Sequence, residues 1–214
     1  MPDRYSTLHL LEDQFEPRSN GTVLRNLLGI TSKEEMEHVE EERFGRLMDE
    51  AVSRFDSDHR FTAQDILWLH KTWLESVYAS AGAYRAVNIG KAGFMFAAAA
   101  HVPELMRQFE RDQLARLTPC RFERVEDVAA ALAEVHVELV LIHPFREGNG
   151  RIARLLSVLM GLQAGLPPLD FTGLDGVKRD EYFAAVQAGM DLDYKPMERI
   201  FSGVIEWTLA SCGR

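Results

Sequence analysis

The sequence predicts a mostly α-helical protein with one small β-hairpin. Two observations support this prediction: apolar residues recur at helical spacing over most of the chain, and short β-capable pieces around glycines occur at 84–96. The 214 residues suit one domain with a well-buried core. We expect residues 1–30 to be an irregular lead-in and residues 31–214 to form a single domain.

The expected helices have their own signals. Thr31, followed three residues later by Glu34, is a capping box that opens a charged helix ending near residue 55. Thr62 is a second N-cap, and the residues behind it form an apolar stripe at three-and-four spacing: Ile66, Leu69, His70, Trp73, Leu74 and Val77. Further helices are expected over 102–117, 125–142, 149–164, 177–190 and 196–210.

Composition excludes several classes of protein. The net charge of −9 gives no overall attraction to nucleic acid or to an anionic membrane, so we expect neither as a partner. Cys120 and Cys212 lie far apart, which argues against a thiolate zinc site or a disulfide framework. The first residues lack the apolar stretch of a signal peptide, and the longest apolar run is 94–100. We therefore expect a cytoplasmic protein.

One segment, 143–154, carries the chemistry: His-Pro-Phe-Arg-Glu-Gly-Asn-Gly-Arg-Ile-Ala-Arg. Gly148 and Gly150 allow backbone N–H groups to approach an anion closely, and the helix that starts near Asn149 directs its positive end to the same place. Arg151 and Arg154 share one helical face and form a suitable clamp for phosphate oxygens.

Two more side chains of this segment have matching chemistry. Glu147 is a hard oxygen ligand, suited to a magnesium ion that arrives with phosphates. His143 titrates near neutrality and can act as a general base. A base, a metal ligand, an anion nest and an arginine clamp within twelve residues indicate phosphoryl or nucleotidyl transfer.

The same segment resembles the signature of the Fic family, His-Pro-Phe-x-Asp/Glu-Gly-Asn-Gly-Arg-x-x-Arg, and every defined position matches. Residues 84–96 resemble the family's flap hairpin, and residues 23–30 resemble the lead-in of its bacterial filamentation-type members. The resemblance implies a Fic-like helical bundle with a hairpin flap. It also implies a nucleotidyltransferase that moves AMP from ATP to a hydroxyl side chain of a target protein.

The resemblance implies a role for each matching position. His143 would be the catalytic base, and Glu147 would hold Mg²⁺. The ATP-binding residues would be Phe145, Gly148, Asn149, Gly150, Arg151 and Arg154. The flap residues that dock the target would be Val87, Asn88, Ile89, Phe94 and Phe96. Related Doc kinases carry Lys at the position of Gly150, so this glycine favours AMP transfer over phosphate transfer.

Other interpretations compete with this one. Gly148–Ala153 also fits a dinucleotide-binding fingerprint, but that motif needs a strand directly before its glycines, and the pattern here is helical. A catalytically silent ATP-binding module of the same fold is a second alternative. His70 is expected to be a core histidine with a partner, and His136 an ordinary helix residue. Tyr182 and Gln187 fit either an adenine pocket or a core or surface role.

Inhibition is a further property that the resemblance suggests. Many Fic proteins are restrained by a Ser/Thr-x-x-x-Glu helix whose glutamate pairs with the second arginine, here Arg154. The chain has two such spacings, Thr31…Glu35 and Ser202…Glu206. The apolar face of the last helix places Glu206 on the solvent side. We therefore expect an inhibitory glutamate, if any, to come from a separate small antitoxin.

Overall fold

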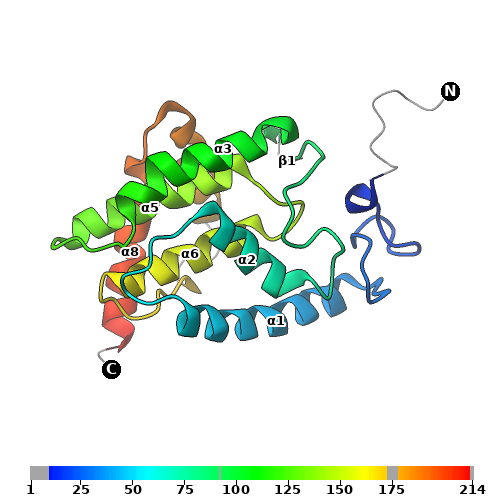
Figure 1. Cartoon of the computed structure of the whole chain (residues 1–214), viewed down its shortest axis with the longest axis horizontal. Coiled ribbons are helices and arrows are strands. Elements are labelled where there is room, and N and C mark those ends of the chain that lie inside the picture. Colours follow the sequence, from blue (N-terminus) through cyan, green and yellow to red (C-terminus); the bar gives the residue numbers. More distant parts are fainter. Residues whose placement is uncertain (1–9, 92, 173–177, 213–214) are drawn as a thin grey trace.

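The computed structural model describes residues 10–91, 93–172 and 178–212 (Figure 1). The helices are α1 (Lys33–Arg54), α2 (Ala63–Leu74), α3 (Val102–Phe109), α4 (Ala115–Leu117), α5 (Val125–Ile142), α6 (Asn149–Gln163), α7 (Lys178–Ala188) and α8 (Lys195–Cys212). The strands β1 (Gly90–Lys91) and β2 (Phe94–Met95) form one antiparallel hairpin. The predicted fold class is confirmed. None of the described helices has the length and apolar character needed to cross a lipid bilayer.

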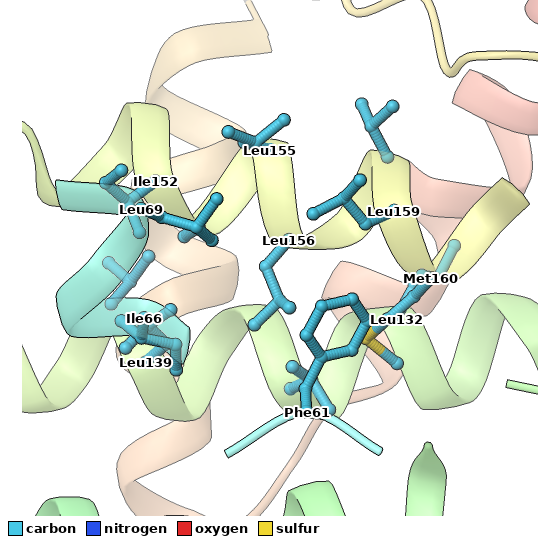
Figure 2. Close-up of a cluster of buried hydrophobic side chains, with 14 of the residues drawn as sticks. Phe61, Ile66, Leu69, Leu132, Leu139, Ile152, Leu155, Leu156, Leu159 and Met160 are labelled. Carbon is cyan, nitrogen blue, oxygen red and sulfur yellow. The ribbon is translucent and has the colours of Figure 1, made fainter. Parts of the chain in front are cut away.

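Helix α5 forms the centre of the bundle, because α3, α6, α7 and α8 all pack against it. The apolar stripe expected for this segment is buried: Val128, Leu132, Val135, Leu139 and Ile142. In Figure 2, Leu132 and Leu139 of α5 lie in one cluster with Leu156 of α6 and Ile66 of α2. Helices α5 and α6 are thus held by a continuous core, which fixes the loop that joins them.

Helices α1 and α2 pack against each other and against α6. At the start of α2 the predicted N-cap is confirmed, and Thr62 and Asp65 form a reciprocal capping box. The capping box expected at Thr31 and Glu34 was wrong by one residue. Ser32 is the N-cap of α1 and accepts a hydrogen bond from the backbone N–H of Glu35 at 3.3 Å. Two adjacent hydroxyl residues compete for this position, and sequence alone does not rank them.

The predicted irregular lead-in packs against the bundle. Its described part, residues 10–30, has a short 3₁₀ turn, η1 (Leu11–Asp13), and an isolated bridge between Phe15 and Leu24. The Glu12 carboxylate accepts the backbone N–H of Ala86 at 2.7 Å, and Val23 and Ile30 are buried. Residues 1–9 of the expected lead-in lie outside the described residues.

Candidate active site

The loop between α5 and α6 is held by its own asparagine. The chain turns at His143 and at Gly148, which both have left-handed backbone conformations, with φ of 52° and 82°. Directly after the second turn, the Asn149 side chain accepts the backbone N–H of Phe145 and donates to the Phe145 carbonyl, each at 2.8 Å. Phe145 itself is fully buried.

Two of the residues predicted to bind ATP, Phe145 and Asn149, have side chains with partners inside the protein. These contacts position the loop. Phe145 stacks on the ring of His70, with centroids 3.7 Å apart and planes 7° from parallel. The backbone of Asn149 still lines the cavity described below.

His70 is a core histidine with partners, as expected. Its Nδ1 accepts the backbone N–H of Gly82 at 2.9 Å, so the ring proton is on Nε2, which donates to the carbonyl of Glu147 at 3.2 Å. Burial lowers the pKa of His70 to about 4. The neutral imidazole of His70 thus holds the loop through Phe145 and the carbonyl of Glu147.

His143 has the tautomer that a general base needs. Its Nδ1 lies 3.1 Å from the carbonyl of Val140, which can only accept, so Nδ1 carries the proton and the Nε2 lone pair remains available. Burial, with smaller contributions from the positive charges of Arg85 and Lys91, lowers the pKa of His143 to about 4. The imidazole is therefore neutral at physiological pH.

Arg85 connects the hairpin to this loop. Its side chain donates to the carbonyl of His143 at 2.6 Å and to that of Val87 at 2.6 Å, and further to the carbonyls of Ile142 and Ala97. These contacts satisfy carbonyls at the C-terminal end of α5 and hold both ends of the hairpin. Only 2% of Arg85 is exposed.

The N-terminus of α6 provides a ready anion site. The first intrahelical bond is from the Ile152 N–H to the Gly148 carbonyl, so the N–H groups of residues 149–151 have no intrahelical partner. A Cβ on Gly148 would lie 2.6 Å from the Trp73 ring, whereas a Cβ on Gly150 would meet open space. Gly148 is thus required by packing, and Gly150 leaves room above the helix end.

The two arginines of α6 differ in environment. Arg151 pairs with Glu40 of α1 at 2.6 Å and lies over the Trp73 ring, 4.4 Å from its centroid. Arg154 is exposed and has no ion pair among the described residues. Glu35 and Glu206, the two glutamates considered as built-in inhibitors, are both exposed and pair with neither arginine in the described structure.

A cavity of about 680 Å³ brings most of these groups together. The lining includes the loop and α6 residues His143, Glu147, Gly148, Asn149, Gly150, Arg151 and Arg154. The hairpin supplies Ile89, Phe94 and Phe96. Val87 is buried and Asn88 accepts the Ala99 N–H through its side chain, so these two predicted flap residues support the hairpin from inside.

Helix α7 contributes Tyr182 and Gln187 to the lining of the same cavity. The Tyr182 hydroxyl lies 2.8 Å from Nε2 of His136. His136 is buried, and burial lowers its pKa to about 3, with a further contribution from the charge of Arg154. His136 is therefore a core residue that supports Tyr182.

Glu147 is the acidic residue of the loop. Its side chain is 47% exposed and lies 3.6 Å from Arg151. Within the described residues, no three or more histidine, cysteine, aspartate or glutamate side chains are placed to hold a metal ion together. The other ligands of a cation at Glu147 would come from water and from a bound phosphate. The dinucleotide-binding alternative fails, because the element before the glycines is the helix α5 and not a strand.

Comparison with known proteins agrees with this geometry. A family model described as "Fic/DOC family" matches residues 60–160. The chain contains a Fic domain. This Fic domain is 31% identical over 153 residues to the protein adenylyltransferase Fic of Drosophila erecta, and 30% identical to that of Culex quinquefasciatus. The alignments cover 69% of this chain but only 28% of each relative, so the chain spans less than a third of their length.

Solved structures support the same fold. The Fic domain of a Bartonella effector protein from Bartonella sp. AR 15-3 matches with a TM-score of 0.74 at 20% identity, covering 94% of this chain and 95% of that one. BepC from Bartonella tribocorum, solved with bound AMPPNP, matches with a TM-score of 0.70 at 20% identity, covering 92% and 98%.

Sequence reasoning missed two residues at the site, Glu40 and Arg85. Glu40 carried a readable signal: with Met36, Leu47 and Ala51 it occupies the buried face of α1, and a charge on such a face predicts a buried partner. Arg85 had no such signal, because its partners are backbone carbonyls, which every sequence contains.

Proposed function

We propose that this chain is a protein adenylyltransferase, which moves AMP from ATP to a hydroxyl side chain of a target protein. One observation carries the proposal: a neutral histidine with a free Nε2 lines the same cavity as the open N-terminus of α6. A base for the hydroxyl and a site for the phosphates are thus a few residues apart. A relative named as a protein adenylyltransferase is 31% identical to this chain over 153 residues.

The phosphates of ATP bind at the end of α6 in this proposal. The N–H groups of residues 149–151 and the helix dipole stabilise the α- and β-phosphates. Arg151 and Arg154 bind the β- and γ-phosphates, because an arginine fork donates several hydrogen bonds to phosphate oxygens. Tyr182 and Gln187, on the α7 side of the cavity, contact the adenosine. Gly150, where the related kinases carry lysine, is consistent with AMP transfer.

The transfer step is a substitution at the α-phosphorus. Nε2 of His143 takes the proton of the target hydroxyl as its oxygen forms a bond to the α-phosphorus. The bond from the α-phosphorus to the oxygen that bridges to the β-phosphate breaks, and pyrophosphate leaves. The products are an AMP-bearing side chain, pyrophosphate and one proton held by His143 until solvent takes it.

Glu147 fits the role of a magnesium ligand. Its carboxylate lies at the cavity and is about half exposed, and Mg²⁺ usually binds one or two carboxylates, several waters and substrate phosphates. When bound there, the ion would neutralise charge that develops on the phosphates. Gly148 donates its N–H to the Glu147 carboxylate at 2.9 Å, which directs that carboxylate along the loop.

The partners follow from the same cavity. The hairpin forms one wall beside His143, so a target segment that pairs with it would place its hydroxyl near Nε2. Arg154 is exposed and lines the cavity, so a glutamate from a separate small antitoxin can reach it. We assign the activity to the cytoplasm, where ATP is abundant.

Radiolabelled ATP in a cell lysate tests the proposal. Addition of the chain should increase protein label from the α-phosphate and should not increase protein label from the γ-phosphate. The matched control is His143→Ala, which should reduce labelling at least about a hundredfold, the usual scale for loss of a general base, while ATP still binds. An increase in protein label from the γ-phosphate on addition of the chain would identify a kinase instead. ATP binding without any labelling would identify the silent binding module.

A further inference from the structure

Glu40 is a buried carboxylate in the middle of α1, with only 4% of the residue exposed. Its Oε1 accepts the Tyr78 hydroxyl at 2.7 Å, and its Oε2 accepts from Nη2 of Arg151 at 2.6 Å. The backbone carbonyl of Glu40 accepts the indole N–H of Trp73 at 2.8 Å. Burying a carboxylate costs free energy unless its hydrogen-bond partners are well placed. The contacts of Glu40 therefore indicate a specific role.

The same contacts hold Arg151 from two sides. Glu40 fixes one guanidinium nitrogen, and the Trp73 ring lies against the guanidinium plane. An arginine carries five N–H donors, and Glu40 occupies one nitrogen of the fork. The Arg151 side chain remains one-third exposed and lines the cavity. The remaining donors are therefore held in a fixed orientation beside the N-terminus of α6.

We propose that Glu40 is a positioning residue, which fixes Arg151 in the orientation that binds the β-phosphate of the nucleotide. This inference rests on the proposed function, because Glu40 is assigned to position Arg151, which that function makes a phosphate ligand. Its physical basis is preorganisation: an arginine already ordered by Glu40 and Trp73 loses less conformational freedom when a phosphate binds. Tyr78 also contributes to this positioning, because its hydroxyl holds the Glu40 carboxylate in place.

The opposite role for Glu40 would be inhibition, in which its carboxylate competes with phosphate for Arg151. The contacts argue against this role. The carboxylate is buried, Tyr78 holds it, and Trp73 holds the backbone of the same residue. Moving the Glu40 carboxylate towards the phosphate site would break its hydrogen bond with Tyr78. The two roles also predict effects of opposite sign when the negative charge is removed.

Calorimetric titration of AMP, ADP and ATP into the full chain provides the test. In Glu40→Gln, ADP and ATP should bind about threefold to tenfold more weakly, the scale of ordering one flexible side chain, and AMP should bind unchanged. The matched control is Glu41→Gln, which removes the same charge from an exposed neighbour on α1. All three dissociation constants should stay at their original values in that control.

Two further variants separate positioning from general packing. Tyr78→Phe removes only the hydroxyl that fixes the carboxylate, and should weaken ADP and ATP binding in the same direction by a smaller factor. Arg151→Ala removes the group that Glu40 is proposed to position. In that background, Glu40→Gln should cause no further change in the ratio of ADP to AMP affinity, because a positioning residue acts only through its partner.

Each alternative outcome is informative. Tighter ADP and ATP binding in Glu40→Gln would overturn positioning and identify an inhibitor. Equal weakening for all three nucleotides, or a persistent effect in the Arg151→Ala background, would also overturn it and identify general packing. The absence of nucleotide binding in the unchanged chain would overturn the proposed function as well. Nucleotide binding without protein labelling would leave the Glu40 test intact.

Discussion

The ring of Phe96 stacks on the imidazole of His143, with centroids 3.6 Å apart and planes 14° from parallel. The hairpin thus covers the group that we propose as the catalytic base. This contact removes water from one face of the imidazole, and burial is the main cause of its lowered pKa. The hairpin therefore influences the chemistry as well as the docking of a target.

The pH dependence of transfer should reflect this contact. A general base must be neutral, and a pKa of about 4 keeps His143 neutral down to that pH, so the acid limb of kcat/KM should lie near pH 4. Phe96→Ala admits water and should move the acid limb upward, towards 6.5. Met95→Ala, which changes an exposed neighbour, should leave it in place. An unmoved limb in Phe96→Ala would show that Phe96 does not desolvate the base.

Target docking should depend on the backbone of the hairpin. The Ile89 carbonyl accepts the Phe96 N–H at 3.1 Å, and proline would keep this carbonyl but remove the Ile89 N–H. Ile89→Pro should therefore reduce target labelling more than it weakens ATP binding, whereas Ile89→Val, which keeps the N–H, should have little effect on either. Unchanged labelling in the proline variant would show that targets dock elsewhere.

Gly148 and Gly150 should differ in how well they tolerate substitution by alanine. Gly148→Ala places a Cβ 2.6 Å from Trp73 at a residue with φ of 82°, so we expect a loss of about 2–4 kcal/mol from the combined strain and overpacking. Gly150→Ala meets open space and should change stability by less than about 1 kcal/mol. Urea unfolding of both variants measures the difference. Similar losses would contradict the packing argument.

Three histidines with lowered pKa values should make the protein sensitive to acid. The pKa values of His70, His136 and His143 are lowered to about 4, 3 and 4. Between those values and 6.5 the unfolded chain binds more protons than the folded one, so stability is complete above 6.5 and falls as pH falls. Three such groups predict a loss of about 4 kcal/mol between pH 7.5 and 5.5.

Urea unfolding at the two pH values measures this loss. His136→Gln removes one of the three groups and should reduce the pH-dependent loss by about a third, whatever its effect on stability at pH 7.5. His38→Gln, at an exposed position on α1, serves as the control and should leave the loss unchanged. The same loss in the His136→Gln variant would contradict the assignment.

The two exposed glutamates considered as inhibitors within this chain, Glu35 and Glu206, should not regulate the enzyme. Glu35 lies in the first turn of α1, and Glu206 lines a separate cavity between α7 and α8 with Asp170 and Trp207. Glu35→Gly and Glu206→Gly should change self-labelling with ATP by less than about twofold, as surface substitutions usually do. A large gain from either variant would identify a built-in inhibitor.

The fold could be predicted from sequence where one element carries its own periodicity. The stripe of α5 and the N-cap at Thr62 are local signals, and both are confirmed. The roles inside the loop could not be separated in this way. Phe145 and Asn149 belong to the same signature as Arg151, but their hydrogen bonds and burial show that they hold the loop. Burial depends on contacts between distant segments, which a motif does not encode.

The four carbonyls that share the Arg85 side chain limit how this domain could acquire new targets. Because one guanidinium anchors both the hairpin backbone and the carbonyl of His143, a change in the path of the hairpin would also shift the base. Exchanges of outward-facing side chains such as Met95 leave that anchor untouched. New targets should therefore be acquired through side-chain substitutions on an unchanged hairpin backbone. Insertions in the hairpin should be selected against.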